Sequence, residues 1–220
     1  HTLTGLALFS LNGINSSANG YAGRLLPNEN LGIDGIEEGT AYNPVSNSSR
    51  NTMVSYAARL DYSYRSRYVF TLTFRADGSS KFVEHWGYFP GIALAWNMHR
   101  EGFFASSFPY ISTSKLRTSY GSNGNNRVSD FATYARLYQD INGYSFNNST
   151  PTGAIYISTV ANPLLVWEKV NTIDMGYELG LFKDKIKLEV DLYRKTTHDL
   201  LLNSTLPPTT GFGSAIKNIG

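Results

Sequence analysis

The 220-residue sequence contains no cysteine, which excludes disulfide bonds and thiolate metal sites. Charged residues make up only 16% of it, whereas soluble domains usually carry roughly 25%. The net charge of +2 gives no reason to expect a nucleic acid or another polyanion as a partner. A continuous apolar run of about 18 residues is also missing, so we do not expect a membrane protein built from helices.

Aromatic residues, in contrast, are abundant at 14% of the chain, and they stand in segments where apolar and polar residues alternate. The clearest example covers residues 52–82, where two alternating runs are joined by the polar link 65–67. Successive side chains of a strand point to opposite sides of a sheet, so the pair of runs predicts an antiparallel hairpin. The apolar positions are Val54, Tyr56, Ala58, Leu60, Tyr62 and Tyr64 in the first run and Tyr68, Phe70, Leu72 and Phe74 in the second.

A second hairpin of the same kind is predicted for residues 171–193, with its link at 183–185. Its apolar positions are Ile173, Met175, Tyr177, Leu179 and Leu181 before the link and Ile186, Leu188, Val190 and Leu192 after it. Shorter alternating segments predict further strands at 1–10, 86–98 and 115–121.

Alternation alone leaves two architectures open. In a soluble β-sandwich the apolar face would meet a second sheet, whereas in an outer-membrane barrel it would contact lipid and the polar face would border a wet lumen. The predicted strands are closer to the roughly 9–11 residues that cross a bilayer than to the about 5–6 of a typical soluble strand. We therefore expect the following side chains to face lipid on a curved sheet: Tyr56, Leu60, Phe70, Leu72, Leu188 and Val190.

The connections between the expected strands differ in length in a regular way. Those that would lie at one rim are rich in Asn, Gly and Ser and mostly long, at about 11–51, 76–86, 122–165 and 203–220. Those at the opposite rim are shorter, at 65–67, 99–112 and 183–185, with one helical turn expected at 101–104. Long loops at one rim and short turns at the other are typical of bacterial outer-membrane barrels. Within 122–165 we expect an extended hairpin from 130–138 and 154–160.

Several motifs then resemble one known family, in order and spacing, from about residue 52 to the end. R-A-D-G-S-S-K-F at 75–82 is followed by W-G-Y-F-P at 86–90, and L-R-T-S-Y-G stands at 116–121. W-E-K at 167–169 and Y-R-K-T-T-H-D-L-L at 193–201 follow. As a set, these motifs resemble the barrel of SusC/RagA-type TonB-linked outer-membrane transporters.

The resemblance implies an all-β fold in which residues 1–220 form an antiparallel transmembrane β-barrel segment of a larger TonB-dependent receptor. It implies import of glycans, oligosaccharides or peptides across the outer membrane of a Gram-negative bacterium, with energy from the TonB complex. Further expected partners are a SusD-like surface lipoprotein and outer-membrane lipid. The N-terminal plug through which TonB would act is not visible, so we expect a piece of a longer protein that catalyses no reaction and needs no cofactor. The alternative left open is a soluble β-sandwich that binds carbohydrate.

Two groups of residues are candidates for contact with a solute. The loop aromatics are candidates for stacking on sugar rings or gripping peptides, because an aromatic face offers apolar area at little entropic cost: Tyr134, Tyr138, Tyr144 and Phe146. The charged residues at polar strand positions are expected to face the lumen: Arg59, Asp61, Arg75, Lys187, Glu189 and Asp191.

Other motifs are better explained without a catalytic or metal-binding role. No close ligand pair exists among the histidines at positions 1, 85, 99 and 198, so no metal site is expected. The D-G-S-S turn at 77–80 lacks the further carboxylates that Ca²⁺ requires. The spacing of Glu189 and Asp191 suits general acid–base chemistry, but Lys187 beside them favours a hydrated wall, and no catalytic residue is assigned.

Overall fold

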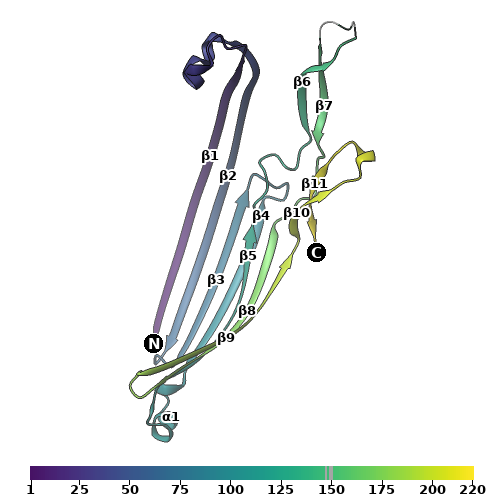
Figure 1. Ribbon diagram of the computed structural model, residues 1–220. Helices are drawn as coiled ribbons and strands as arrows, with labels where there is room; N and C mark the ends of the chain where they lie inside the picture. The colour runs from purple at the N-terminus through teal and green to yellow at the C-terminus, as the bar shows by residue number, and fades with distance from the viewer. Residues whose placement is uncertain (147, 149–150) are drawn as a thin grey trace.

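The computed structural model describes residues 1–146, 148 and 151–220 and consists mainly of antiparallel strands (Figure 1). The strands are β1 (Thr2–Arg24), β2 (Thr40–Tyr64), β3 (Tyr68–Ser79), β4 (Trp86–Asn97), β5 (Ile111–Asn125), β6 (Arg136–Tyr144), β7 (Thr152–Thr159), β8 (Glu168–Leu181), β9 (Ile186–His198), β10 (Leu200–Thr205) and β11 (Ser214–Ile219). The short helical segments are η1 (Glu29–Glu38), η2 (Met98–Arg100), α1 (Gly102–Ser107) and η3 (Pro208–Thr210). Across the described part of the chain, no helix has the length and apolarity needed to cross a membrane.

Seven strands form one sheet in the order β1-β2-β3-β4-β5-β8-β9, and these are the segments whose alternation predicts strands. All neighbours are antiparallel, so the predicted all-β, antiparallel fold class is confirmed. Between β2 and β3 the chain reverses through Arg65 and Ser66, whose φ angles of 49° and 53° are those that a type I′ hairpin turn requires. The Arg67 N–H closes this turn by donating to Tyr64 O at 2.9 Å.

The prediction of a long loop at 11–51 is wrong, because most of this segment is strand. β1 and β2 pair with each other as far as Arg24 and Thr40, and only the η1 segment connects them. This ladder pairs the backbone N–H and C=O groups that the two segments turn toward each other, which outweighs the loop preference of their Asn, Gly and Ser residues. β3 ends where Ser79 pairs with Met53, so residues 13–24 and 40–51, here termed the arm, continue beyond it as two strands alone (Figure 1).

The other two expected long loops also contain strands. Within 122–165, β5 runs on to Asn125, and the expected extended hairpin exists as β6–β7, shifted along the chain from 130–138 and 154–160. Within 203–220, β10 and β11 form a second hairpin, which reverses through η3 and Gly211 at φ 78°. In these two hairpins, period-two alternation is a weak signal of strand structure. A two-stranded hairpin with both faces exposed has no face that must be apolar.

The predicted division into two rims is confirmed (Figure 1). The β2–β3 turn, the β8–β9 turn and α1 lie at one end of the sheet, and η1, β6–β7 and β10–β11 lie at the other. Polar contacts join the connections of the short-turn rim. Arg67 Nη1 lies 3.0 Å from Glu101 Oε2, and the Ser112 hydroxyl donates to Asp184 Oδ1 at 2.6 Å.

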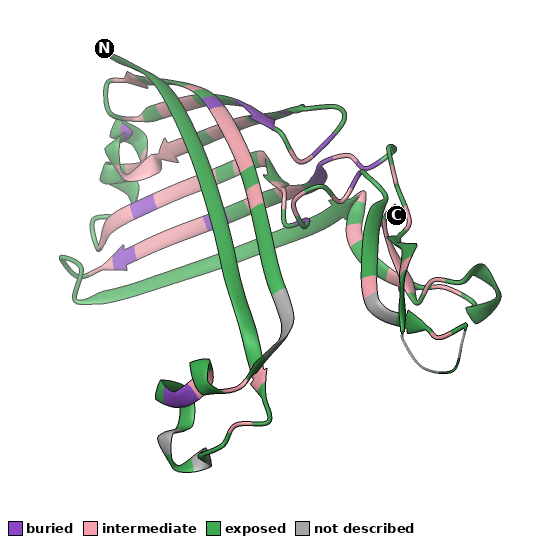
Figure 2. Cartoon of the chain, turned by 90° about the horizontal axis from the view of Figure 1, so that it is seen from above, coloured by how far each residue is buried: buried purple, intermediate pink, exposed green. Residues whose placement is uncertain are grey.

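Figure 2 shows that few residues of the main sheet are buried. The larger buried apolar side chains form one cluster near its long-loop end. The Trp167 ring packs 5.1 Å from Phe82 and 5.7 Å from Phe89, and its Nε1 donates to His85 O at 3.0 Å. Phe89 fits because Gly124 carries no side chain, since a Cβ there would collide with the Phe89 ring. This outer core fastens the loops of the long-loop rim to the sheet, and its members are Phe82, Phe89, Val128, Leu165 and Trp167.

Two adjacent leucines test the outer core. The side chain of Leu165 is 0% exposed and that of Leu164 is 81% exposed. We expect Leu165→Ala to cost about 2–5 kcal/mol of local stability, because it leaves a cavity. Leu164→Ala should stay within about 0.5 kcal/mol of the unchanged protein. The rate of proteolysis in segment 160–167, measured for both variants, checks this, and equal rates would contradict a core at Leu165.

Candidate functional site

Adjacent rows of side chains across the main sheet differ sharply in chemistry. One row runs Leu3, Tyr62, Phe70, Leu94, Thr118, Met175 and Leu192. The next runs Thr4, Asp61, Thr71, Ala93, Ser119, Asp174 and Tyr193 on the opposite face. Because the register is continuous, the two faces stay distinct from β1 to β9, and we term them the apolar face and the polar face.

The apolar face is uncovered. Five of the six side chains expected on it as lipid contacts are exposed, and Phe70 is half-buried. A β-sandwich would require a second sheet against them, but the other strands in the described residues form only two hairpins at the long-loop rim. The sandwich alternative is therefore not favoured.

Two rows of aromatic rings cross the apolar face near its ends. Toward the short-turn rim, the ring centroid of Tyr68 lies 6.4 Å from that of Tyr64 and 6.3 Å from that of Trp96. Toward the long-loop rim, Tyr56 packs 5.3 Å from Phe9 and 6.0 Å from Trp86. Between these rows the apolar face mixes aliphatic side chains, as at Leu60 and Leu72, with aromatic ones such as Phe74.

The polar face carries a charged cluster on β5, β8 and β9. Lys115 Nζ lies 3.0 Å from Glu178 Oε1. Arg117 Nη2 lies 2.6 Å from Asp191 Oδ1 and also pairs with Glu189. One guanidinium thus ties β5 to β9 across the intervening strand, with the charge-assisted hydrogen bonds that its planar fork favours.

A glycine makes this reach possible. Gly176 pairs with Arg117 on β5 and with Asp191 on β9, so it lies directly between them. A Cβ on Gly176 would collide with both Arg117 Nε and Asp191 Oδ1. The Arg117 guanidinium therefore crosses β8 through the space that a side chain at position 176 would occupy.

Two further arginines on the polar face pair within their own strands. Arg59 holds Asp61 through two hydrogen bonds of 2.7 and 2.9 Å, and the Thr71 hydroxyl donates to the same carboxylate at 2.6 Å. Arg75 Nε lies 2.8 Å from Asp77, whose side chain is almost fully buried. Each arginine is thus neutralised by a carboxylate two residues farther along the chain.

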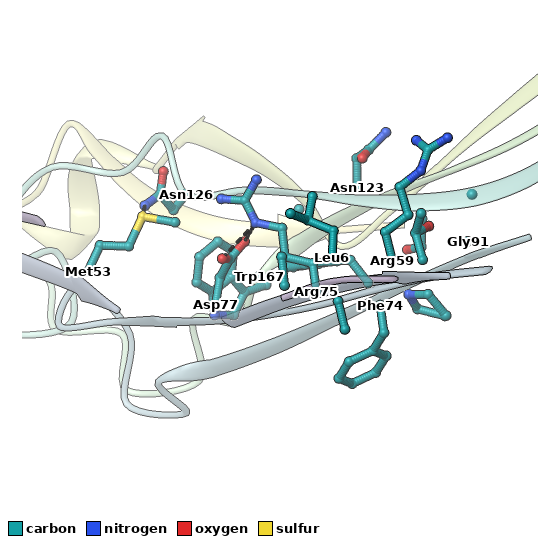
Figure 3. Close-up of a pocket in the computed structure, with 18 residues that line it drawn as sticks. Leu6, Met53, Arg59, Phe74, Arg75, Asp77, Gly91, Asn123, Asn126 and Trp167 are labelled. Atoms are coloured by element: carbon teal, nitrogen blue, oxygen red, sulfur yellow. Dashed lines mark hydrogen bonds and ion pairs between the residues drawn. The ribbon is translucent and has the colours of Figure 1, made fainter. Parts of the chain in front are cut away.

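A hollow of about 440 Å³ lies on the polar face between these arginines and the outer core (Figure 3). Figure 3 shows Arg59, Arg75 and Asn123 on one side of the sheet, while Phe74 points to the other. A Cβ on Gly121, which lines the hollow, would meet no atom within 4 Å, so the absent side chain leaves that space open.

Two carboxylates in the connections between strands are held in their ionised form. Hydrogen bonds from Ser112 first, and then Thr113, lower the pKa of Asp184 in the β8–β9 turn. At the opposite rim, the Asn51 amide donates to Asp130 at 3.1 Å and is the main cause of the lowered pKa of that carboxyl. Each carboxylate thereby ties a connection to a neighbouring segment.

The four aromatic residues predicted to contact a solute are all exposed near the long-loop rim, but they do not come together. Tyr138 packs 5.4 Å from Tyr156 across the β6–β7 hairpin. Tyr144 packs 4.9 Å from Phe146 at the far end of that hairpin. Tyr134 lies before the hairpin, beside the arm.

The family model described as TonB dependent receptor-like, beta-barrel matches residues 3–220. The chain belongs to this receptor β-barrel family. Its members are transporters rather than enzymes, and the resemblance read from the sequence motifs is confirmed.

Individual relatives agree with the family assignment. TonB-dependent receptor SusC of Bacteroides thetaiotaomicron is 38% identical over 192 residues, which cover 84% of this chain and 18% of SusC. TonB-dependent receptor P26 of Formosa agariphila is 34% identical over 209 residues, which cover 89% of this chain and 20% of P26. The chain thus spans about a fifth of the length of these relatives.

A solved structure shares the fold of this receptor segment. The structure of the RagAB peptide transporter superposes with a TM-score of 0.81 at 23% identity. The match covers 99% of this chain and 24% of the RagAB chain. The curled antiparallel sheet is therefore the fold of part of a TonB-dependent receptor barrel.

In this receptor segment, the six charged residues predicted to face a lumen all lie on the polar face: Arg59, Asp61, Arg75, Lys187, Glu189 and Asp191. The structure joins Glu189 and Asp191 through Arg117, and it pairs Arg59 with Asp61. Sequence reasoning missed Arg117 as the centre of the charged cluster. Alternation in 115–121 puts it on the polar face, but its partners follow only from the register of β5 with β8 and of β8 with β9.

Two glycines of the polar face test the role of Gly176. We expect Gly176→Ala to destabilise the receptor by about 1–3 kcal/mol, because the new methyl group enters the Arg117–Asp191 contact. Gly121→Ala is the matched control, since its methyl group would meet open space. Unfolding in urea of the detergent-folded receptor measures both changes, and equal losses would contradict a passage at Gly176.

Proposed function

We propose that the chain forms part of the wall of an outer-membrane importer, with its apolar face against lipid and its polar face along the conduit. The observation that carries the proposal is the continuous separation of the two faces across seven strands. Exposed apolar surface on this scale needs a covering, because water-exposed patches of several hundred Å² mark interaction surfaces or cause aggregation. The paired charges of the polar face suit a hydrated conduit, since charged side chains at the bilayer centre are costly.

The two aromatic rows support a position for the bilayer. Tyr56 and Tyr64 are eight residues apart on β2, which is about 26 Å of strand at roughly 3.3 Å per residue. At the strand tilt of about 35–45° usual in such barrels, that corresponds to a height of about 20 Å, comparable with the apolar band of about 25 Å. Aromatic rings are favoured at both membrane interfaces, where their apolar bodies and polar tips meet matching surroundings.

The orientation follows from the lengths of the connections. Outer-membrane barrels have short turns on the periplasmic side and long loops outside the cell. The arm, β6–β7 and β10–β11 would then project outward from a Gram-negative cell, and α1 with the two tight turns would face the periplasm. The host receptor would open to its solutes at the long-loop rim.

Energy supply and partners come from the relatives. SusC and P26 are TonB-dependent receptors, and RagAB is a peptide transporter. We propose uptake of oligosaccharides or peptides driven by the TonB complex acting through a plug, with a SusD-like lipoprotein at the outer mouth. In such an assembly this chain supplies wall and outer loops, and it performs no chemical reaction.

Adjacent positions on β4 test the membrane proposal, since Leu94 lies on the apolar face and Ala93 on the polar face. This chain has no cysteine, so a single introduced cysteine can carry a fluorescent label at either position. In lipid vesicles, we expect spin-labelled lipid to quench the label on Leu94→Cys strongly and that on Ala93→Cys weakly. Aqueous iodide should quench them in the opposite order.

Three results would contradict this assignment of the faces. The first is equal quenching by lipid at both positions. The second is a label at position 94 that neither quencher reaches, which is the result for a residue enclosed in a soluble core. The third is a receptor that stays monodisperse and folded without detergent or lipid.

A further inference from the structure

Toward the long-loop rim, where β8 begins and β9 ends, the apolar face changes character (Figure 1). Its last apolar members there are Ile173 on β8 and Leu192 on β9. Beyond them the same face carries five polar residues, here termed the basic patch: Lys169, Asn171, Arg194, Thr196 and His198. In the proposed membrane position, contact with hydrocarbon therefore ends at Ile173 and Leu192 on these two strands.

The register of β8 with β9 gathers the basic patch into a strip two strands wide. Lys169 lies directly opposite His198, and Asn171 lies opposite Thr196. Side chains in directly opposite positions have Cβ atoms about 4.5–5.5 Å apart. Arg194 precedes His198 by four residues, about 13 Å along the strand at roughly 3.3 Å per residue, and its long side chain can extend toward the rim.

The cations of the basic patch have no acidic partners. Lys169, Arg194 and His198 are all exposed, and none of them forms an ion pair within the described part of the chain. Asp199 follows His198 but leaves the strand at a φ of 55° and pairs with none of the three. On the polar face, in contrast, Arg117 is neutralised by carboxylates.

Every side chain of the basic patch can donate a hydrogen bond, and none of them carries a negative charge. A guanidinium binds phosphate through two parallel N–H···O bonds, and an ammonium binds it as a point charge. Unpaired cations beside an apolar band are the arrangement that attracts anionic lipid headgroups. The chemistry of the patch therefore suits a phosphorylated headgroup whose acyl chains lie against the apolar face.

We propose that the basic patch binds the phosphate groups of lipopolysaccharide in the outer leaflet. The inference rests on the proposed function, in which the apolar face meets lipid and the long-loop rim points out of the cell. In that position the patch lies where hydrocarbon gives way to headgroups, on the side of the membrane that holds lipopolysaccharide. It names one lipid partner of the wall and the residues that recognise it.

The experiment uses the complete receptor that carries this chain, purified in an uncharged detergent. Native mass spectrometry measures its binding of bisphosphorylated lipid A, of the same lipid A after removal of both phosphates, and of phosphatidylglycerol. We expect the bisphosphorylated form to bind at least about tenfold more tightly than the other two. Arg194→Gln and Lys169→Gln should each weaken that binding about fivefold, through loss of one attracting charge.

The matched control is Lys195→Gln. Lys195 is also exposed on β9, but it lies on the polar face opposite Thr172, so the loss of its charge should leave the affinity for lipid A unchanged. Equal weakening by Lys195→Gln and Arg194→Gln would overturn the proposal. So would equal binding of lipid A with and without its phosphates, or binding of phosphatidylglycerol as tight as that of lipid A.

The labels on β4 separate this proposal from the proposed function. A receptor whose Leu94→Cys label is quenched by lipid, while Arg194→Gln and Lys169→Gln leave its affinity for lipid A intact, overturns the basic patch alone. A receptor whose label at position 94 is not reached by lipid overturns the proposed function as well.

Discussion

A single antiparallel register through seven strands keeps the two faces of this sheet distinct, with most apolar side chains of β2 to β9 on one face and most charged side chains on the other. A slip of one residue between any two strands would move every side chain of one strand to the other face. It would, for example, bring Arg117 into a row with Trp96 and Tyr177 and cost several kcal/mol if that face meets hydrocarbon. The register is thus fixed by the same contrast of environments that a barrel wall needs.

Glycines set the positions of the long side chains within this register. On the polar face, Gly176 lets Arg117 reach Asp191 across β8. On the apolar face, the Trp86 ring lies over Gly78, where an added Cβ would stand 3.2 Å from it, and so comes within 6.0 Å of Tyr56. Neither glycine has a positive φ, so the space above it, and not backbone strain, explains why it carries no side chain.

The two ends of the sheet are built for different tasks. The short-turn rim is closed by tight turns and by direct pairs such as Arg67 with Glu101. The long-loop rim has the only sizeable hydrophobic core in the described residues, and it holds the connections around Trp167 to the sheet. The exposed arm and the β6–β7 hairpin rise beyond that core, so a rigid base carries the surfaces that would meet a solute.

Period-two alternation and ordered motifs are local properties of a chain, so they sufficed to predict the seven strands of the main sheet, the two faces, the division into two rims and the family. They did not reveal the arm within 11–51 or the strands inside the other two expected loops, because a polar two-stranded ladder is stabilised by pairing that composition does not record. Folding joined Arg117 to Glu189 and Asp191, set Tyr134 apart from Tyr144, and brought Asn47 opposite Phe131 and Tyr134. The residues in these contacts are about 70 or more positions apart in the sequence. Their positions depend on strand register and on how the loops are anchored, and no local sequence pattern records either.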